Sequence, residues 1–246
     1  MAKRILILGG TGEAAGLARR VHETLGPQAE VILSLAGRTR APASVPVAVR
    51  SGGFGGAKGL GDYLRRENIA IVVDATHPFA ATMSAHARTA CAETGIPRLQ
   101  WVRPAWTIPA RARIVWAETL AEAAAKLPAL ARAAFLAVGG RGLAAFASLP
   151  NVRLVARAVE RPETLPRGVE LVIGRPPFTV AEETALFRAH GIDTLVARES
   201  GGTGFAKIEA ASDLGLNILL IRRPPPEPGD RAATTAAALA WIADRL

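Results

Sequence analysis

Cysteine is almost absent from this sequence of 246 residues, in which Cys91 stands alone. A single cysteine excludes an internal disulfide and the paired CxxC motifs of structural zinc sites, so we predict no metal site. No apolar run reaches the roughly 18 residues of a transmembrane helix. The N-terminal apolar run at residues 5–8 is too short for a signal peptide. These absences predict a compact cytoplasmic protein without a membrane partner.

Acidic residues are scarcer than basic ones, with 21 Asp and Glu against 30 Lys and Arg and a formal net charge of +9. Such an excess attracts anions, which include nucleic acids, phosphorylated cofactors and polycarboxylate metabolites. The arginines are spread along the whole chain, without the dense basic run that is typical of a nucleic-acid-binding tail. We therefore predict no nucleic-acid partner, and the charge leaves the other two kinds of anion open.

Short runs rich in Ile, Val and Leu alternate with segments of helical spacing. This alternation predicts βαβ units, and hence an α/β fold with mainly parallel sheets flanked by helices. The predicted strands cover residues 5–8, 31–35, 69–73, 98–102, 114–116, 134–138, 153–156, 171–173, 194–197 and 218–221. The predicted helices cover residues 13–25, 59–67, 82–94, 120–127, 180–190, 207–214 and 231–246, and a further helix starts at residues 142–146.

A segment interrupted by prolines divides the chain in two. Pro104 and Pro109 flank a stretch in which no regular element is expected. We predict two Rossmann-like domains, one at residues 1–108 and one at residues 109–246. The second half echoes the first, since glycine clusters follow a predicted strand at residues 9–12 and again at residues 139–142.

The motif Gly-Thr-Gly-Glu-Ala-Ala at residues 10–15 follows the first predicted strand and opens the first predicted helix. It fits the G-x-G-x-x-G/A fingerprint of dinucleotide-binding turns in the expected context. Gly10 permits the tight turn, Gly12 lets the backbone approach a pyrophosphate, and Ala15 lets helix and strand pack closely. The alternative is a glycine turn that only joins strand to helix. The predicted cofactor contacts at this turn are Gly10, Thr11, Gly12 and Glu13.

The second predicted strand ends without the acidic residue that binds the ribose hydroxyls in NAD-binding folds. Residues 33–37 contain no Asp or Glu, and Arg38 follows at once. An acid would repel the 2′-phosphate of NADP, whereas a guanidinium binds it with paired charge-assisted hydrogen bonds. Ser34, Arg38 and Thr39 together favour NADPH as the cofactor, the alternative being that Arg38 is a solvated loop residue.

Six short motifs run through nearly the whole chain. They are Gly-Gly-Thr-Gly-Glu-Ala at residues 9–14, Ser-Leu-Ala-Gly-Arg-Thr at 34–39, Arg-Ser-Gly-Gly-Phe-Gly-Gly at 50–56, Asp-Ala-Thr-His-Pro-Phe-Ala at 74–80, Glu-Ser-Gly-Gly at 199–202 and Lys-Ile-Glu-Ala-Ala at 207–211. Together they resemble the precorrin-6A reductases of cobalamin biosynthesis. One departure is Glu199, which stands where that family is expected to carry Lys, Asp or Asn.

The resemblance implies a two-domain, Rossmann-like enzyme that transfers hydride from NADPH to the tetrapyrrole macrocycle precorrin-6A, giving precorrin-6B. Residues 1–108 would bind NADPH, and residues 109–246 would contribute to a substrate cleft between the domains. A corrin precursor carries several carboxylates, which suits a cleft lined by some of the excess arginines. The metal-free macrocycle is the predicted substrate, although the motifs themselves do not separate it from the cobalt-bearing one.

Two loops of the first half are expected beside the reacting groups. The glycines after residue 51 let the backbone approach a ligand, or else form a hinge. His77 follows a predicted strand end and is the candidate proton donor or substrate orienter. Its alternatives are a loop histidine bonded to the backbone and a proton delivered by solvent. The predicted cofactor contacts in these loops are Gly52, Gly53, Phe54, Thr76, His77 and Pro78.

The predicted substrate-binding residues are Ser200, Gly201, Gly202 and Lys207. Residues 200–204 precede a predicted helix that contains Lys207, so their NH groups and its positive charge can hold a carboxylate. The alternative is a flexible connector. Two other functions stay open for the whole chain: an NADPH-dependent reductase of a different anionic substrate, and a non-catalytic regulator that senses NADP.

Overall fold

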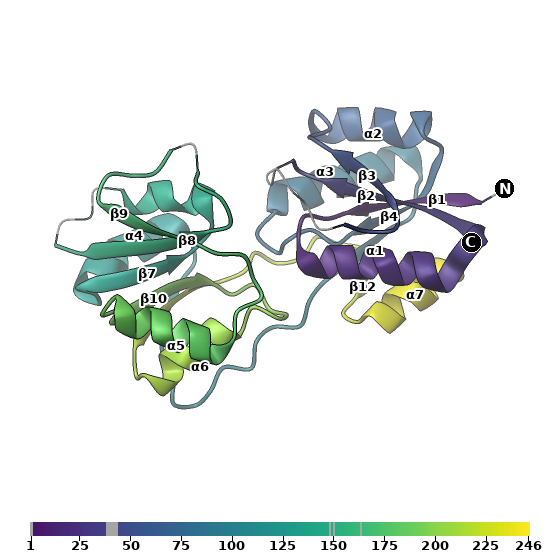
Figure 1. Cartoon of the computed structure of the whole chain (residues 1–246). Helices are drawn as coiled ribbons and strands as arrows, with labels where there is room; N and C mark the ends of the chain where they lie inside the picture. The colour runs from purple at the N-terminus through teal and green to yellow at the C-terminus, as the bar shows by residue number, and fades with distance from the viewer. Residues whose placement is uncertain (1, 38–43, 148, 150, 163) are drawn as a thin grey trace. The chain divides into compact units, whose positions relative to one another are not determined.

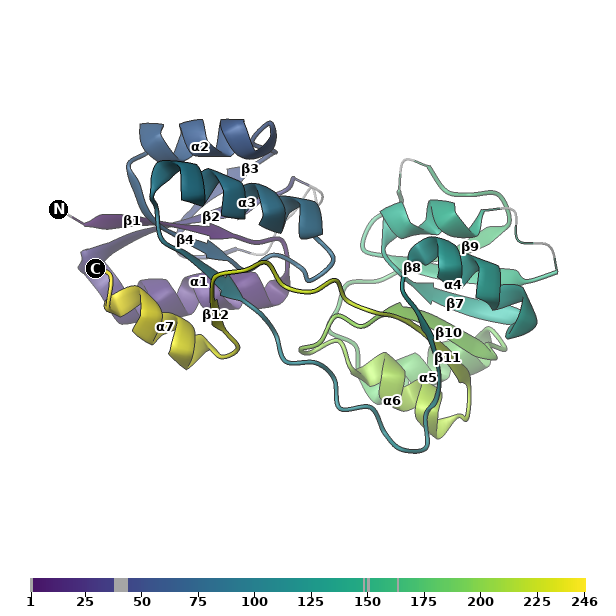
Figure 2. The ribbon, with the colours of Figure 1, turned by 180° about the vertical axis from the view of Figure 1, so that it is seen from behind.

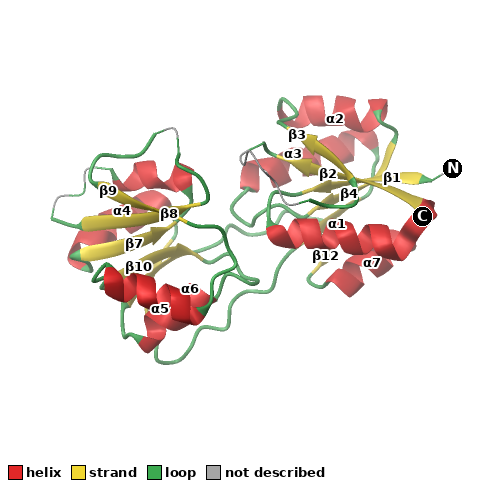
Figure 3. Cartoon of the chain, in the orientation of Figure 1, coloured by secondary structure: helices red, strands yellow, loops and turns green. Residues whose placement is uncertain are grey.

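The computed structural model of the protein describes residues 2–37, 44–147, 149, 151–162 and 164–246. The chain forms two compact units. Unit 1 consists of Met1–Arg103 together with Pro224–Leu246, and unit 2 consists of Pro104–Arg223. Each unit is an α/β sandwich in its own right, with a parallel sheet between helices (Figure 3).

In unit 1 the described residues form a six-stranded sheet in the order β12-β5-β4-β1-β2-β3, and every neighbouring pair is parallel. Numbered along the unit, this is the strand order 6-5-4-1-2-3 of a doubly wound nucleotide-binding fold. The strands are β1 (Lys3–Leu8), β2 (Ala29–Leu35), β3 (Ala48–Ser51), β4 (Ile69–Asp74), β5 (Arg98–Trp101) and β12 (Asp230–Ala232).

Helices cover both faces of this sheet (Figure 1). Helices α1 (Gly12–Leu25) and α7 (Thr235–Ala243) lie side by side on one face, where Val21 and Ile242 are fully buried in a common core. Helices α2 (Gly56–Arg66) and α3 (Ala81–Thr94) cover the other face. A short 3-10 helix, η1 (Gly26–Gln28), leads from α1 to β2.

Unit 2 also carries a six-stranded parallel sheet in its described residues, in the order β6-β11-β10-β7-β8-β9. Numbered along the unit, the order is 1-6-5-2-3-4, so the direction of winding reverses between β7 and β10. The strands are β6 (Arg113–Ala117), β7 (Ala133–Ala137), β8 (Arg153–Ala158), β9 (Val169–Ile173), β10 (Thr194–Arg198) and β11 (Asn217–Ile221).

The helices of unit 2 again lie on both faces of the sheet, as the view from behind also shows (Figure 2). Phe187 of α5 packs edge-on against Phe135 of β7, with ring centroids 5.3 Å apart. A capping box begins α5, because Thr179 and Glu182 satisfy each other's backbone NH groups. The helices are α4 (Leu120–Lys126), η2 (Leu127–Ala129), η3 (Gly140–Phe146), α5 (Val180–Ala189) and α6 (Ala206–Asp213).

The predicted fold class, two Rossmann-like domains with parallel sheets, is confirmed. The predicted division at residues 108 and 109 differs from the structure, because the C-terminal segment returns to unit 1. There β12 pairs with β5, and α7 buries Ala238 and Ile242 beside α1. The predicted helix at residues 231–246 is therefore wrong in its first part, where β12 precedes the Thr234 cap of α7.

Two smaller differences have local causes. Strand β3 was not predicted, since its four residues Ala-Val-Arg-Ser lie at the sheet edge and none of them is buried. The helix predicted to start at residues 142–146 is the 3-10 helix η3, which begins at Gly140. Gly139 precedes it with a φ of 74°, and the chain leaves the helix at Ala147 in an extended conformation.

Among the described residues, no helix combines the length and the apolar character that crossing a membrane requires.

The place of α7 in the core of unit 1 gives a first prediction. Ile242→Ala should lower the free energy of unfolding of this unit by about 2–5 kcal/mol, because it opens a cavity at a fully buried site. Ile173→Ala is the matched control, since Ile173 is 56% exposed on β9 of unit 2. Urea unfolding, monitored by peptide-resolved hydrogen exchange, shows which unit loses stability. Equal stability of both variants would contradict the assignment of α7 to this core.

Candidate cofactor and substrate sites

The candidate cofactor site of unit 1 lies at the carboxyl ends of β1 and β4, because the direction of winding reverses between these two strands. In open parallel sheets such a reversal of winding leaves a crevice between the diverging loops, where ligands bind. Backbone hydrogen bonds of 2.9 Å continue the pairing past both strand ends, from Gly9 N to Ser34 O and from Ala75 N to Leu8 O. The sheet therefore fixes the starting point of each loop.

The glycine turn, residues 9–12, meets three separate demands. Gly9 has no room for a side chain, since an added Cβ would lie 2.8 Å from the Leu33 side chain and 3.1 Å from Ala14 Cβ. Gly10 has a φ of 126°, a conformation that favours glycine. An added Cβ at Gly12 would meet nothing within 4 Å, so the backbone there is open. Gly9 and Ala14 are thus closely packed, and Ala15 is partly buried against the same core.

The first turn of α1 carries a cap and an ion pair. Thr11 is the N-cap, and its hydroxyl accepts a hydrogen bond from Ala14 N at 3.2 Å. The Glu13 carboxylate accepts a hydrogen bond from Arg103 Nη1 at 3.0 Å. Arg103 is 8% exposed, so this ion pair is largely shielded from water. The side chain of Glu13 is therefore engaged with the protein itself.

Ser34 lies at the end of β2, opposite Arg50 of β3 in the register of the two strands. Arg50 Nη1 donates to Ser34 Oγ at 3.2 Å and to the Gly52 carbonyl at 2.7 Å, and Nη2 donates to the Gly53 carbonyl at 2.8 Å. The guanidinium also stacks on Phe54, with its carbon 3.7 Å from the ring centroid. Ser34 and the loop after β3 thus share one arginine.

Two further residues predicted for this part of the site, Arg38 and Thr39, lie outside the described residues. The structure therefore leaves their roles as predictions. The chain before them is described as far as Gly37, whose φ is 69°. Gly52 N continues the β2–β3 pairing beyond the strands by donating to Leu35 O at 3.0 Å.

The loop after β4 is held by the buried carboxylate of Asp74, which is 1% exposed. Its Oδ1 accepts hydrogen bonds from Thr76 N at 3.2 Å and from Thr76 Oγ1 at 2.7 Å. Its Oδ2 lies 3.8 Å from Arg98 Nη1, and the same arginine donates to the Pro228 carbonyl at 2.6 Å. Asp74 thus fixes the turn that leads to the next histidine.

His77 is bonded to the backbone of its own turn. Its Nδ1 accepts a hydrogen bond from Phe79 N at 3.2 Å, and its ring lies 5.8 Å from that of Phe79. Nδ1 is therefore unprotonated, and the ring carries its hydrogen on Nε2. Pro78 stands between the two aromatic residues, before α3 begins at Ala81. The structure thus contains the backbone contact that the sequence analysis weighed as the alternative for His77.

Apart from Ser34, which lies within β2 next to its last residue, the predicted cofactor contacts among the described residues of unit 1 follow the carboxyl ends of β3, β1 and β4. The four strands β3, β2, β1 and β4 are consecutive in the sheet. The strand topology gathers them at one edge of the sheet. The four predicted substrate-binding residues belong to unit 2.

Unit 2 has its own reversal of winding, between β7 and β10. Glycines follow β7, and an added Cβ at Gly142 would lie 3.3 Å from Arg198 Nη2. Nearby in the sheet, Arg157 at the end of β8 donates to the buried carboxylate of Glu183 at 2.6 Å. Its guanidinium stacks on Phe178 at 3.6 Å. The carboxyl edge of this sheet is therefore rich in arginine.

The loop of residues 200–204 follows β10 at this reversal. Gly201 and Gly202 have φ values of 62° and 65°, and the Gly202 carbonyl accepts a hydrogen bond from Trp106 Nε1 at 3.0 Å. Lys207 Nζ donates to the Gly204 carbonyl. Burial lowers the pKa of the Lys207 ammonium to about 8, against a smaller opposing effect of Glu183. These hydrogen bonds thus fix the conformation of the loop. Helix α6 begins after it, at Ala206.

Sequence reasoning missed the charged residues that organise these loops. Arg50 was quoted only as part of a glycine-rich motif, and Arg103 was not considered. Glu199 was noted only as a departure from a family pattern, although it is 7% exposed and paired with Arg223. Ser34 as a partner of Arg50, Glu13 as that of Arg103 and Arg223 as that of Glu199 lie far away in sequence, so the local sequence carries no signal for these pairs.

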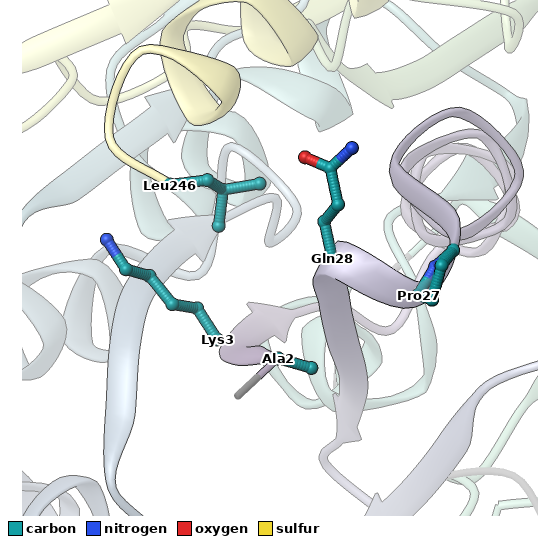
Figure 4. Close-up of a pocket in the computed structure, with 5 residues that line it drawn as sticks. All are labelled: Ala2, Lys3, Pro27, Gln28 and Leu246. Carbon is teal, nitrogen blue, oxygen red and sulfur yellow. The ribbon is translucent and has the colours of Figure 1, made fainter.

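A pocket of about 400 Å³ lies at the opposite edge of the unit 1 sheet, at the amino end of β1 (Figure 4). It is lined by Ala2, Lys3, Pro27, Gln28 and Leu246. Lys3 Nζ donates to the Arg245 carbonyl at 2.9 Å, which ties the two chain ends together. Ligands of this fold bind at the carboxyl ends of the strands. This pocket therefore does not belong to the candidate site.

Comparison with known proteins gives one consistent family. Residues 4–243 match the family described as Precorrin-6x reductase CbiJ/CobK. A Precorrin-6A reductase from Rhodobacter capsulatus is 45% identical, over 98% of this chain and 96% of that protein. A Precorrin-6A reductase from Rhodococcus erythropolis is 44% identical, over 97% of both chains. A solved structure titled CobK precorrin-6A reductase aligns with a TM-score of 0.91 and 42% identity, over 99% of this chain and 97% of that chain. This chain therefore belongs to the precorrin-6x reductase family.

Proposed function

We propose that this protein reduces precorrin-6A to precorrin-6B in cobalamin biosynthesis, with NADPH as the hydride donor. The observation that carries the proposal is an open glycine turn at the switch point of a nucleotide-binding sheet, in a chain of the precorrin-6x reductase family. Membership of a reductase family implies a nicotinamide cofactor. The choice of NADPH and the role of each residue are the further parts of the proposal.

A dinucleotide fits the glycine turn because the backbone is uncovered there. An added Cβ at Gly10 or Gly12 would meet no heavy atom within 4 Å. The first turn of α1 offers amide groups that precede the intrahelical hydrogen bonds, and these amides hold the pyrophosphate. When bound, NADPH supplies the hydride. Thr11 keeps the helix start in place, and Glu13 contributes through its backbone, because its carboxylate is bound to Arg103.

The 2′-phosphate of NADPH is the proposed ligand of Ser34, Arg38 and Thr39. Arg50 supports this end of the site, because it places a guanidinium 3.2 Å from Ser34 Oγ and holds it there by two further hydrogen bonds. Residues 33–37 contain no acid that would repel a phosphate. The loop carrying Gly52, Gly53 and Phe54 lies against the same arginine, and we place it beside the cofactor.

His77 is proposed to orient the bound groups instead of donating the proton. The hydrogen bond from Phe79 N to Nδ1 holds the ring in one orientation. Protonation at Nδ1 would break this hydrogen bond. Thr76 and Pro78 fix the same turn, beginning from Asp74. The proton that completes the reduction then comes from solvent.

The substrate's carboxylates are the proposed ligands of Ser200, Gly201, Gly202 and Lys207. The loop of residues 200–204 presents backbone groups in a fixed conformation, and Lys207 supplies a positive charge at its end. The metal-free macrocycle is the proposed form of the substrate. Relatives named Precorrin-6A reductase share 40–45% identity with this chain, whereas a Cobalt-precorrin-6A reductase from Priestia megaterium shares 32%.

An anaerobic assay tests the function directly. With precorrin-6A present, the purified protein should oxidise NADPH with a matching stoichiometric change in the macrocycle spectrum. Gly12→Ala should weaken NADPH binding about 10- to 100-fold, because the added methyl group displaces the pyrophosphate from charge-assisted hydrogen bonds. Gly16→Ala, on the same helix and equally free of contacts within 4 Å, should leave binding unchanged. Tight NADPH binding without turnover would point to another reductase or a sensor.

The choice of cofactor has its own test. Arg38→Ala should weaken NADPH binding by about 1.5–3 kcal/mol and NADH binding much less, because only NADPH carries the 2′-phosphate. Dissociation constants for both cofactors, measured by fluorescence titration, give the comparison. An equal loss of affinity for the two cofactors would show that Arg38 does not bind the 2′-phosphate.

Lys207 makes substrate binding depend on pH. Its pKa of about 8 means that the ammonium is present below pH 8 and is lost as the pH rises through that value. The KM for precorrin-6A should therefore rise above pH 8, by up to about tenfold per pH unit. Lys207→Arg keeps the charge at every pH and should flatten this profile. Lys207→Met should raise KM below pH 8, to a value that does not change with pH and that the unaltered protein approaches at high pH. A rise that persists in Lys207→Arg would assign the effect to another group.

A further inference from the structure

Glu199 is a buried carboxylate whose two oxygens are both used. Its Oε1 accepts hydrogen bonds from Arg223 Nη2 at 2.7 Å and from Trp106 N at 3.2 Å. Its Oε2 accepts a hydrogen bond from Arg223 Nε, which completes a bidentate contact with the guanidinium. The Glu199 side chain is 9% exposed and that of Arg223 is 16% exposed. Such a paired, shielded contact is both strong and specific in direction.

The partners of Glu199 are the two ends of unit 2. Trp106 stands near the point where the chain enters the unit at Pro104, and Arg223 is its last residue. Arg223 Nη2 also donates to the Pro104 carbonyl at 3.5 Å. Glu199 itself follows β10 and directly precedes the loop of residues 200–204. Three stretches that are distant in sequence therefore meet at one carboxylate.

The same contacts extend into the loop. Trp106 Nε1 donates to the Gly202 carbonyl at 3.0 Å, so one tryptophan bonds both Glu199 and the loop. There is no room for a side chain at Gly201, because an added Cβ would lie 2.2 Å from the Pro104 carbonyl oxygen and 2.5 Å from Arg223 Nη2. The conformation of the loop is thus set by the segment at Pro104 and by Arg223, and Glu199 holds both of them.

We propose that Glu199 is a positioning residue that fixes the loop of residues 200–204 in the conformation that binds a carboxylate of the tetrapyrrole. This inference rests on the proposed function. Glu199 acts through Trp106 and Arg223 and does not itself touch the substrate, since both of its oxygens are bonded within the protein. Loss of its charge leaves Arg223 without its carboxylate and frees the Trp106 indole from its fixed place beside Gly202.

Steady-state kinetics of Glu199→Gln test the proposal. The KM for precorrin-6A should rise roughly tenfold or more, as expected when charge-assisted hydrogen bonds are lost, while the KM for NADPH should stay within about twofold. The matched control is Asp213→Asn, because Asp213 is also paired with an arginine of unit 2, Arg111, but both side chains are half exposed. This control should leave both constants unchanged. An unchanged substrate KM in Glu199→Gln, or an equal rise for both ligands, would overturn the proposal.

An NMR measurement provides a readout that does not depend on turnover. The chain has four tryptophans, and the indole NH signal of Trp106 should shift and exchange faster with solvent in Glu199→Gln but not in Asp213→Asn. If Glu199→Gln does not fold, Arg223→Lys is measured in its place, because lysine keeps the positive charge but cannot make the bidentate contact. Absence of turnover in the unaltered protein would refute the proposed function, whereas turnover with an undisturbed indole in the variant would refute only this inference.

Discussion

The reversal of winding between β1 and β4 is the constraint on which the candidate cofactor site depends. The chain leaves β1 toward β2 and leaves β4 toward β5, so the two segments diverge and leave backbone accessible between them. Because every neighbouring pair in the sheet is parallel, all carboxyl ends reach the same edge. The glycine turn, Ser34 and His77 are gathered there by topology, and the side chains around them only refine that arrangement.

The parts of the fold with a local signal were predictable from the sequence. Buried parallel strands such as β1 and β4 are nearly continuous apolar runs, and α1 begins within the glycine motif that was predicted to open a helix. Strand β12 has no such signal, because only Ala232 of its three residues is buried. It is a strand because β5 offers an edge to pair with, and the chain reaches that edge only after it has returned from unit 2. Sequence patterns therefore found the units but not the returning segment.

The candidate site divides in the same way. Glycine positions are predictable because a positive φ, as at Gly10, is a local demand of the backbone. The charged partners are not predictable, because each acid has many possible basic partners in a chain with 30 Lys and Arg. That Arg50 meets Ser34 follows from the register of β2 and β3, and that Arg223 meets Glu199 follows from the packing of unit 2. Neither can be read from spacing along the chain.

Charge pairing also explains how unit 2 holds buried acids. Glu183 and Glu199 are each bonded to an arginine, so their negative charge is neutralised where it is used to hold structure. Lys207 differs, because its bonded partner is the neutral carbonyl of Gly204. Burial without a bonded acid makes its positive charge costly, which is why the pKa falls to about 8. Under the proposed function, a substrate carboxylate bound beside Lys207 would compensate this charge and raise the pKa again, which would couple substrate binding to proton uptake by the amine.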